Sequence, residues 1–179
     1  RFVYIHFKTD NMNEQLRIRM EDIFAEADRL IGEQKIGEAF SKLTSITQEM
    51  PNFGKAYNHI GWIYETKYKD YPNAEKNYKL AIEYSPDYQA GYYNYAVVLS
   101  TLQKWSELES LLNKAITIPG INKGTIQNEY AMMYEAQGRY DEAINAYKQY
   151  IINSFDNRQI DTAKDSIERC KKKKEILSL

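Results

Sequence analysis

AYNHIGWIYE, residues 56–65, is the stretch that decides the fold, because its pattern returns twice further along the chain. The copies GYYNYAVVLS from Gly91 and QNEYAMMYEAQGRYDEAINAY from Gln127 follow at a spacing of about 35 residues. A period in this range is typical of units that are too small to bury their own apolar faces and must stack on a neighbour. The sequence therefore predicts a solenoid of stacked repeats.

Each copy contains two apolar stripes with the period of an α-helix. In the best copy the first stripe has residues at i, i+3, i+4 and i+7, which lie on one face of a helix. The second stripe ends at Pro86, where a helix stops. The two stripes of this copy consist of Tyr57, Ile60, Gly61 and Tyr64, followed by Ala74, Tyr78 and Ala81. Each copy is therefore predicted to form a pair of helices.

The whole chain can be divided in this way, with a weaker fourth copy at the start. Residues 1–12 carry a β-prone apolar run without helical period, which predicts an irregular or extended segment. Residues 154–179 form an amphipathic stretch with a charged outer face, which predicts a capping helix. Between them, over residues 13–153, we expect a repeat domain with individual repeats at about 20–53, 54–88, 89–121 and 122–153. The predicted fold is all-α, a right-handed α-α superhelix of about four helix pairs plus a C-terminal capping helix.

This pattern resembles the tetratricopeptide repeat family. Its template places an aromatic, a large apolar, a small residue and a tyrosine on the first helix, then a small residue, an aromatic and an alanine on the second, with proline at the junction. Residues 57–86 match each position if one extra residue is allowed in the turn at 67–71. The resemblance covers roughly residues 20–151. It implies a scaffold that binds a peptide segment of a partner protein in a concave groove.

Small and aromatic residues on the stripes have a steric explanation. We expect Gly61, Ala96 and Ala131 at points where the first helix of a pair closely approaches the second. Tyrosines fill the wider spaces, and their hydroxyl groups are expected to reach a polar edge. The tyrosines predicted to pack in this way are Tyr64, Tyr78, Tyr95, Tyr134 and Tyr147.

The resemblance also implies where the groove lies. In similar proteins the first helices of successive pairs line it, with residues that are offset from the core stripe. That offset predicts a peptide-binding groove formed by Lys55, Asn58, His59, Trp62, Glu65, Tyr93, Asn94, Val97, Thr101, Asn128, Glu129, Met132 and Glu135.

Three asparagines of this set, Asn58, Asn94 and Asn128, occur in successive repeats. An asparagine side chain can bond both the N–H and the C=O of an extended peptide, so the three could hold main chain without demanding a particular sequence. Trp62, Tyr93 and Met132 of the same set would add apolar anchors. The alternative that the asparagines are simply solvated surface remains open.

One subgroup of the family binds the C-terminal carboxylate of chaperones through Lys and Arg together with Asn on first helices. Here the corresponding positions hold Phe24 and Asp28 in the first copy and Thr125, Asn128 and Glu129 in the fourth. Because the cations are missing, we do not expect this chain to bind acidic chaperone tails.

Charge and composition argue against several functional classes. The chain has 179 residues with 24 Lys+Arg, 25 Asp+Glu and a formal net charge of -1, so it lacks the basic excess of nucleic-acid or anionic-membrane binders. No apolar run approaches the roughly 18 residues that membrane insertion requires. The single cysteine, Cys170, permits neither an internal disulfide nor the usual Cys/His zinc sites, and it suits a cytoplasmic location.

Catalysis has little support in the sequence. Neither histidine, His6 or His59, has a Ser, Cys or Asp at a recognisable catalytic spacing, and phosphate-loop, dinucleotide and metalloprotease motifs are missing. We expect no enzyme activity, no cofactor and no metal. The predicted function is a protein-binding adaptor. The alternatives are a module that pairs two copies of itself, or an accessory domain of a larger enzyme or secretion assembly whose upstream part precedes Arg1.

Overall fold

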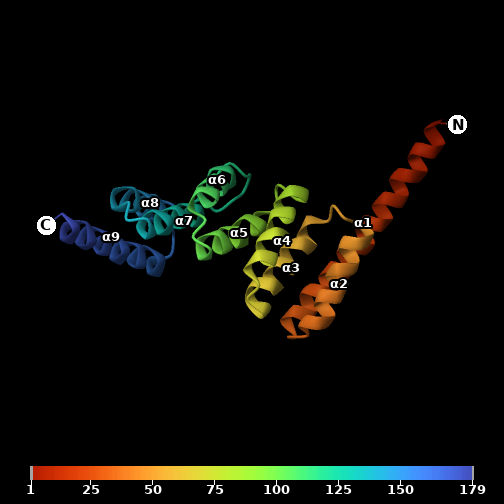
Figure 1. Ribbon diagram of the computed structural model, residues 1–179. Helices are drawn as coiled ribbons and strands as arrows, with labels where there is room; N and C mark the ends of the chain where they lie inside the picture. The colour runs from red at the N-terminus through yellow and green to blue at the C-terminus, as the bar shows by residue number, and fades with distance from the viewer. Residues whose placement is uncertain (1, 179) are drawn as a thin grey trace. The chain divides into compact units, whose positions relative to one another are not determined.

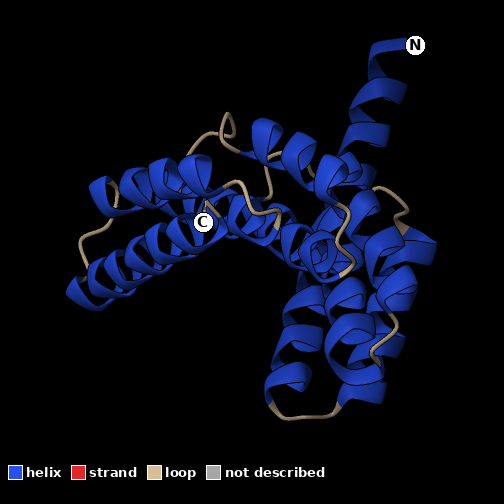
Figure 2. Cartoon of the chain, turned by 60° about the vertical axis from the view of Figure 1, so that its left-hand side comes forward, coloured by secondary structure: helices blue, strands red, loops and turns tan. Residues whose placement is uncertain are grey.

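The computed structural model describes the backbone of residues 2–178 and the side chains of residues 13–178. Over these residues the chain consists of helices and loops, without a strand (Figure 2). The predicted all-α class is therefore confirmed. The elements are α1 Phe2–Gly32, α2 Ile36–Glu49, α3 Gly54–Ile63, the π-helical turn η1 Tyr64–Tyr68, α4 Tyr71–Tyr84, α5 Gln89–Thr101, α6 Trp105–Ala115, α7 Lys123–Ala136, α8 Tyr140–Ile152 and α9 Asn157–Leu177.

The helices are grouped in two compact units, Arg1–Asn94 and Tyr95–Leu179. In the first unit α1 packs on α2, α2 on α3 and α3 on α4 (Figure 1). In the second unit α6 packs on α7, α7 on α8 and α8 on α9. We call α1, α3, α5 and α7 first helices and α2, α4, α6 and α8 second helices. Each predicted repeat thus contains one helix pair, and its core lies between the paired helices and their neighbours.

The start of α1 corrects one prediction. An extended segment was expected over residues 1–12, but the backbone of residues 2–12 is the beginning of α1. An isolated extended run would need a neighbouring strand for its hydrogen bonds, and the described part of the chain contains none. A helix satisfies these backbone groups within the segment itself. The side chains of residues 1–12, and Arg1 altogether, lie outside the described residues.

The turn inside each helix pair has the same backbone form. The left-handed residues Gln34, Lys69, Gln103 and Gly138 follow the first helices, with φ of 62°, 55°, 55° and 73°. In the second pair the next backbone N–H bonds to a carbonyl in η1, at 2.9 Å. In the other three pairs it bonds to the carbonyl five residues back in the first helix, also at 2.9 Å. This is the Schellman closure of a helix end, in which a left-handed residue lets the chain reverse direction. The repeat period of the sequence therefore recurs in the backbone.

The second pair accommodates its extra residue in the helix end. Tyr64–Tyr68 form a π-helical turn directly after α3, and a π turn is what results when one residue is inserted into a helix. The N–H of Asp70 consequently reaches back six residues to the carbonyl of Tyr64, at 2.9 Å. Asp70 then caps α4, since its carboxylate accepts from the N–H of Asn73 at 3.1 Å.

The small residues of the first-helix stripes are buried, and Gly61 marks a close approach of α3 to α4, as predicted. Ala96 and Ala131 are fully buried. Gly61 is buried, and a Cβ added to it would lie 2.9 Å from the ring of Tyr78. Tyr78 is itself completely buried, so the ring of the second helix fills the space that the missing side chain of Gly61 leaves.

Three of the five stripe tyrosines place their hydroxyl groups at polar edges, as expected. Their rings are buried or half-buried within the helix pairs. The hydroxyl groups donate to carboxylates, in the pairs Tyr78–Glu65 at 2.6 Å, Tyr134–Glu109 at 3.1 Å and Tyr147–Glu135 at 3.0 Å. These rings therefore serve the core, and their polar ends remain satisfied.

α9 packs on α8 with one buried stripe. Ala163, Ser166, Ile167 and Cys170 occupy i, i+3, i+4 and i+7 and are all buried, which is the spacing of a first helix. Asp156 caps the helix, because its carboxylate accepts from the N–H of Arg158 at 2.8 Å. Burial raises the pKa of the Cys170 thiol to about 11, and this cysteine is a packing residue of the buried stripe.

Candidate functional site

A pocket of about 310 Å³ lies on the first helices of the first unit. It is bounded by α1, α3, the start of α5 and the loop before α5. Four predicted groove residues, from α3 and α5, come together there. The lining consists of Asp28, Ile31, Asn58, His59, Trp62, Tyr88, Ala90 and Asn94.

Two asparagines form the polar wall of this pocket. Nδ2 of Asn94 donates to Oδ1 of Asn58 at 3.0 Å, and the Asn58 side chain is also hydrogen bonded to the hydroxyl of Tyr88. Asn58 is only 3% exposed. The alternative that the asparagines are merely solvated surface is therefore wrong for Asn58. Its amide joins α3 to α5 and to the preceding loop.

His59 lies beside the asparagines and bridges α3 to α1. Its Nε2 is 3.1 Å from Oδ1 of Asp28, and its Nδ1 is 3.3 Å from the carbonyl oxygen of Lys55. The ring also meets Phe24 edge-on, with centroids 4.6 Å apart. A neutral imidazole has one N–H and can donate to only one of these two oxygens, whereas an imidazolium can donate to both.

Charged groups surround the tryptophan side of the pocket. Nζ of Lys67 lies 5.3 Å from the centroid of the Trp62 ring and donates to Gln34 at 3.1 Å. Burial raises the pKa of Tyr88, and the carboxylates of Asp28 and Glu21 raise it further. Both carboxylates therefore disfavour the phenolate form of Tyr88.

A second hollow adjoins this pocket within the first unit. It measures about 460 Å³ and shares Tyr88 and Ala90 with the first pocket. Its remaining lining comes from Asp87, Gln89 and Tyr93. Tyr93, another predicted groove residue, thus extends the surface along the start of α5.

The second unit holds six of the predicted groove residues, Val97, Thr101, Asn128, Glu129, Met132 and Glu135. Val97 and Met132 expose their apolar side chains, at 44% and 41%. Nδ2 of Asn128 contacts the sulfur of Met132 at 3.9 Å, and Thr101 bonds to the carbonyl oxygen of Val97 at 2.9 Å. Burial raises the pKa of Glu129. A peptide groove over these residues remains a prediction.

Three predicted groove residues bind other helices of their own units. Lys55 donates to both carboxylate oxygens of Glu21 on α1, at 2.9 Å and 3.1 Å. Glu65 accepts from the hydroxyl of Tyr78 on α4 at 2.6 Å. Glu135 accepts from Nε and Nη2 of Arg169, both at 2.7 Å, and from Nζ of Lys173 at 2.9 Å. The hydrogen bonds from Arg169 contribute most to lowering the pKa of the Glu135 carboxyl to about 2, and the bond from Lys173 adds to this effect. Each carboxylate is oriented by these neighbours, which the offset along one helix does not reveal.

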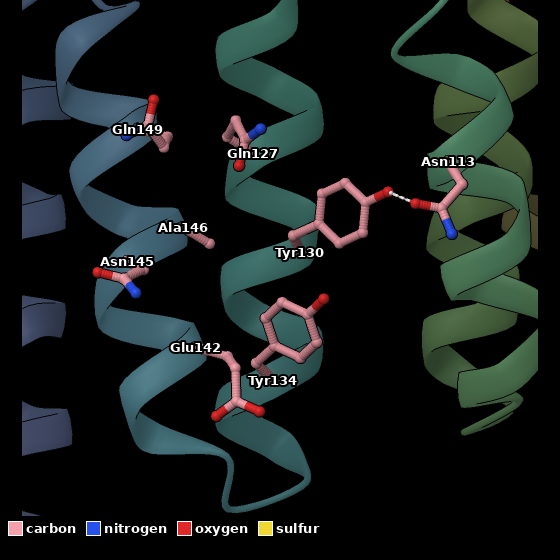
Figure 3. Close-up of a pocket in the computed structure, with 8 residues that line it drawn as sticks. All are labelled: Asn113, Gln127, Tyr130, Tyr134, Glu142, Asn145, Ala146 and Gln149. Carbon is pink, nitrogen blue, oxygen red and sulfur yellow. Dashed lines mark hydrogen bonds between the residues drawn. The ribbon is translucent and has the colours of Figure 1, made fainter.

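Figure 3 shows a pocket of about 310 Å³ that the sequence analysis missed. It lies in the second unit among α6, α7 and α8. The hydroxyl of Tyr130 on α7 donates to Oδ1 of Asn113 on α6 at 2.6 Å. The Tyr130 and Tyr134 rings stack with centroids 5.9 Å apart. The sequence feature that could have indicated this pocket is a pair of exposed side-chain amides four residues apart on α8, Asn145 and Gln149. The lining consists of Asn113, Gln127, Tyr130, Tyr134, Glu142, Asn145, Ala146 and Gln149.

Two further properties concern only the described residues. They contain no group of three or more His, Cys, Asp or Glu side chains that could hold a metal ion. Among the helices that they form, none combines the length and the apolar character needed to cross a membrane.

Comparison with known proteins shows that this chain is similar to them in sequence and in fold. A family model described as tetratricopeptide repeat matches residues 54–88 and 125–151. Yeast Tom70 superposes with a TM-score of 0.73 at 22% identity, over 88% of this chain and 34% of Tom70, so the chain spans about a third of that protein. None of the curated protein sequences matches this chain.

Two smaller proteins have similar folds. YrrB, described as a tetratricopeptide-repeat protein with an unusual peptide-binding site, superposes with a TM-score of 0.71 at 17% identity, over 86% of this chain and 76% of YrrB. The tetratricopeptide-repeat domain of Arabidopsis OM64 gives 0.58 at 21% identity, over 68% of this chain and 98% of that domain. At such identities the likeness concerns the fold alone.

Proposed function

We propose, from the premise that this chain belongs to the tetratricopeptide-repeat family, that its first unit binds an extended segment of a partner protein. Folds of this family generally act as scaffolds for protein–protein interaction. The segment would lie in the pocket of about 310 Å³ on α1, α3 and α5. The observation that carries the proposal is the convergence of Asn58, His59, Trp62 and Asn94 on this pocket.

The size and continuity of the surface suit a peptide. Pockets for ligands usually measure about 300–1,000 Å³, so the first hollow can take one or two side chains. The second hollow continues from Tyr88 and Ala90 along the start of α5. A segment that fills the first hollow could therefore run on into the second without leaving the first unit.

The chemistry of the walls suits both side chains and main chain. Trp62 is half-buried and offers a large aromatic surface, the residue type that dominates many interface energies. Asn94 and Tyr88 add hydrogen-bonding groups at the pocket wall. Apolar contact with Trp62 would thus provide affinity, and the polar groups would orient the bound chain.

A peptide display selection tests the proposal. Random peptides are selected on the wild-type chain, and the affinities of the winners are measured for Trp62→Ala and for Ala90→Trp. The first variant removes the aromatic wall, whereas the second narrows both hollows. We expect each to weaken binding by about tenfold or more, the loss typical of a central interface residue.

Trp105→Ala is the matched control, because Trp105 is also a half-buried tryptophan but lies on α6, outside the lining of either hollow. Thermal melts check that every variant remains folded. Winners that bind the wild type, Trp62→Ala and Ala90→Trp equally would show that the pocket is not the binding site.

A further inference from the structure

The two adjoining hollows of the first unit carry a charge imbalance. Asp28 lines the first and Asp87 the second. Among the described residues that line them there is neither a lysine nor an arginine, and the other lining residues are His59 and uncharged side chains. Carboxylates around a concave surface attract cationic groups.

Two lysines that contact pocket residues have partners other than Asp28. Lys55 donates to both carboxylate oxygens of Glu21, at 2.9 Å and 3.1 Å. Lys67 is exposed, donates to Gln34, and places its Nζ 5.3 Å from the centroid of the Trp62 ring. The second contact is a cation–π contact, and the face of an indole attracts cations in general.

Asp28 retains capacity for a ligand. Its side chain is 66% exposed, and its Oδ1 lies 3.1 Å from Nε2 of His59. A carboxylate has two oxygens and about four lone-pair sites, so one contact with His59 leaves room for N–H donors from a bound peptide. Behind the effect of burial, the Asp28 carboxylate also raises the pKa of the Tyr88 hydroxyl, which lines the same pocket.

We infer that the partner segment inserts a lysine or arginine side chain into this pocket, with its cationic head group on the Asp28 carboxylate. The aliphatic stem lies along Ile31 and the Trp62 ring, as long basic side chains do when they cross an apolar surface. This inference rests on the proposed function and narrows it to basic segments of partner proteins. Acidic segments would meet Asp28 and Asp87 without a compensating cation in the lining.

The display selection described above also tests this inference. Winners that depend on Trp62 are expected to be enriched in Lys and Arg. For such peptides Asp28→Asn should weaken binding by about fivefold, the upper range for a solvent-accessible ion pair, and the affinity should fall as salt is added. Asp22→Asn is the matched control, since Asp22 is exposed on α1 and lines neither hollow.

A charge reversal gives a readout that a purely structural contribution of Asp28 would not move. Asp28→Lys should prefer versions of the winning peptides in which the basic residue is replaced by glutamate. Trp62-dependent winners without a basic preference, or with an acidic one, would overturn this inference and leave the proposed function standing. If no winner depends on Trp62, both the inference and the proposed function fail.

Discussion

Asn94 donates a hydrogen bond of 3.0 Å to Asn58 across 36 residues of sequence, and it thereby ties α5 to α3. Asn58 is 3% exposed, so water has little access to its carbonyl oxygen. A buried acceptor that loses its donor retains the desolvation penalty without the compensating bond. This pair therefore stabilises the first unit as well as shaping the pocket.

Asn94→Ala should destabilise the first unit by about 1–2 kcal/mol, the range for an unsatisfied buried amide. Hydrogen exchange is the suitable measurement, because it reports on each unit separately. The α3 backbone amides of the variant are expected to exchange faster than those of the wild type. Asn128→Ala, on α7 in the second unit, should leave exchange in α3 unchanged. Equal protection of α3 in the wild type and in Asn94→Ala would contradict the stabilising contribution of the pair.

Gly61→Ala should destabilise the first unit by about 1–3 kcal/mol, because the new Cβ would lie 2.9 Å from the buried Tyr78 ring. Gly37→Ala is the control, since a Cβ there meets nothing within 4 Å and alanine favours a helix over glycine by up to about 1 kcal/mol. Urea unfolding of both variants decides the point. Opposite signs are expected, and a stabilised Gly61→Ala would refute the close approach of α3 and α4.

The left-handed turn residues predict a reciprocal pair of substitutions. Gly138 has φ of 73°, so Gly138→Ala should lose about 1 kcal/mol of stability. Gln103 has φ of 55° at the corresponding turn, and Gln103→Gly should gain about 0.5 kcal/mol after the entropy of glycine is subtracted. Calorimetric melting of each variant beside the wild type tests this. Destabilisation by both substitutions would show that the left-handed geometry does not govern these turns.

Glu135 should make the second unit sensitive to acid. Its pKa is about 2 in the folded chain, below the ordinary value of 4.5, because Arg169, Lys173 and Tyr147 bind its carboxylate. A lowered pKa stabilises the fold above the unfolded pKa and loses this effect as pH falls through the folded pKa. Stability should therefore decline between about pH 4.5 and pH 2.

Glu135→Gln should remove this part of the pH dependence and destabilise the second unit by about 2 kcal/mol at neutral pH, since its cationic partners are half exposed. Asp141→Asn, which breaks a pair between Lys174 and a carboxylate that is 69% exposed, should have a smaller effect. Denaturation from pH 7 to pH 2 followed by circular dichroism provides the measurement. If Glu135→Gln unfolds with acid in the same way as the wild type, the acid response arises from other groups.

Acidic chaperone-tail peptides should not bind measurably to this chain. The first unit presents Asp28 at the position where a clamp for a carboxylate would need a cation, and this side chain lies in the lining of the pocket. Isothermal titration calorimetry with such a peptide, beside a basic peptide from the display selection, checks the expectation. A clear micromolar affinity for the acidic peptide would refute it.

Sequence reasoning worked best where the relevant contacts are periodic along one helix. The stripe spacing placed Gly61, Ala96 and Ala131 in the core, and all three are buried. It also required one extra residue at 67–71, although only the structure shows that this residue is absorbed by the π-helical turn at Tyr64–Tyr68. It missed the helical start of α1, because apolar residues at consecutive positions have no helical period to detect.

The candidate site was less accessible to such reasoning. A fixed offset from the core stripe identified Asn58, His59, Trp62 and Asn94 as neighbours of one pocket. The same offset placed Glu135 in a groove, whereas Arg169, 34 residues later, binds its carboxylate. Offsets along one helix define a face, but they do not say which side chain of the next helix reaches that face.

The amino-acid order by itself determined the helix pairs, their small-residue contacts and their tyrosine-filled cores, because these depend on a local spacing of three to four residues. The tertiary structure alone decided that Asn58 is buried beneath Asn94, that Asp28 faces His59, and that a second pocket opens among α6, α7 and α8. The physical reason is that these contacts join residues 17 to 36 positions apart. Their geometry depends on how neighbouring helices pack, which no periodicity within a single helix encodes.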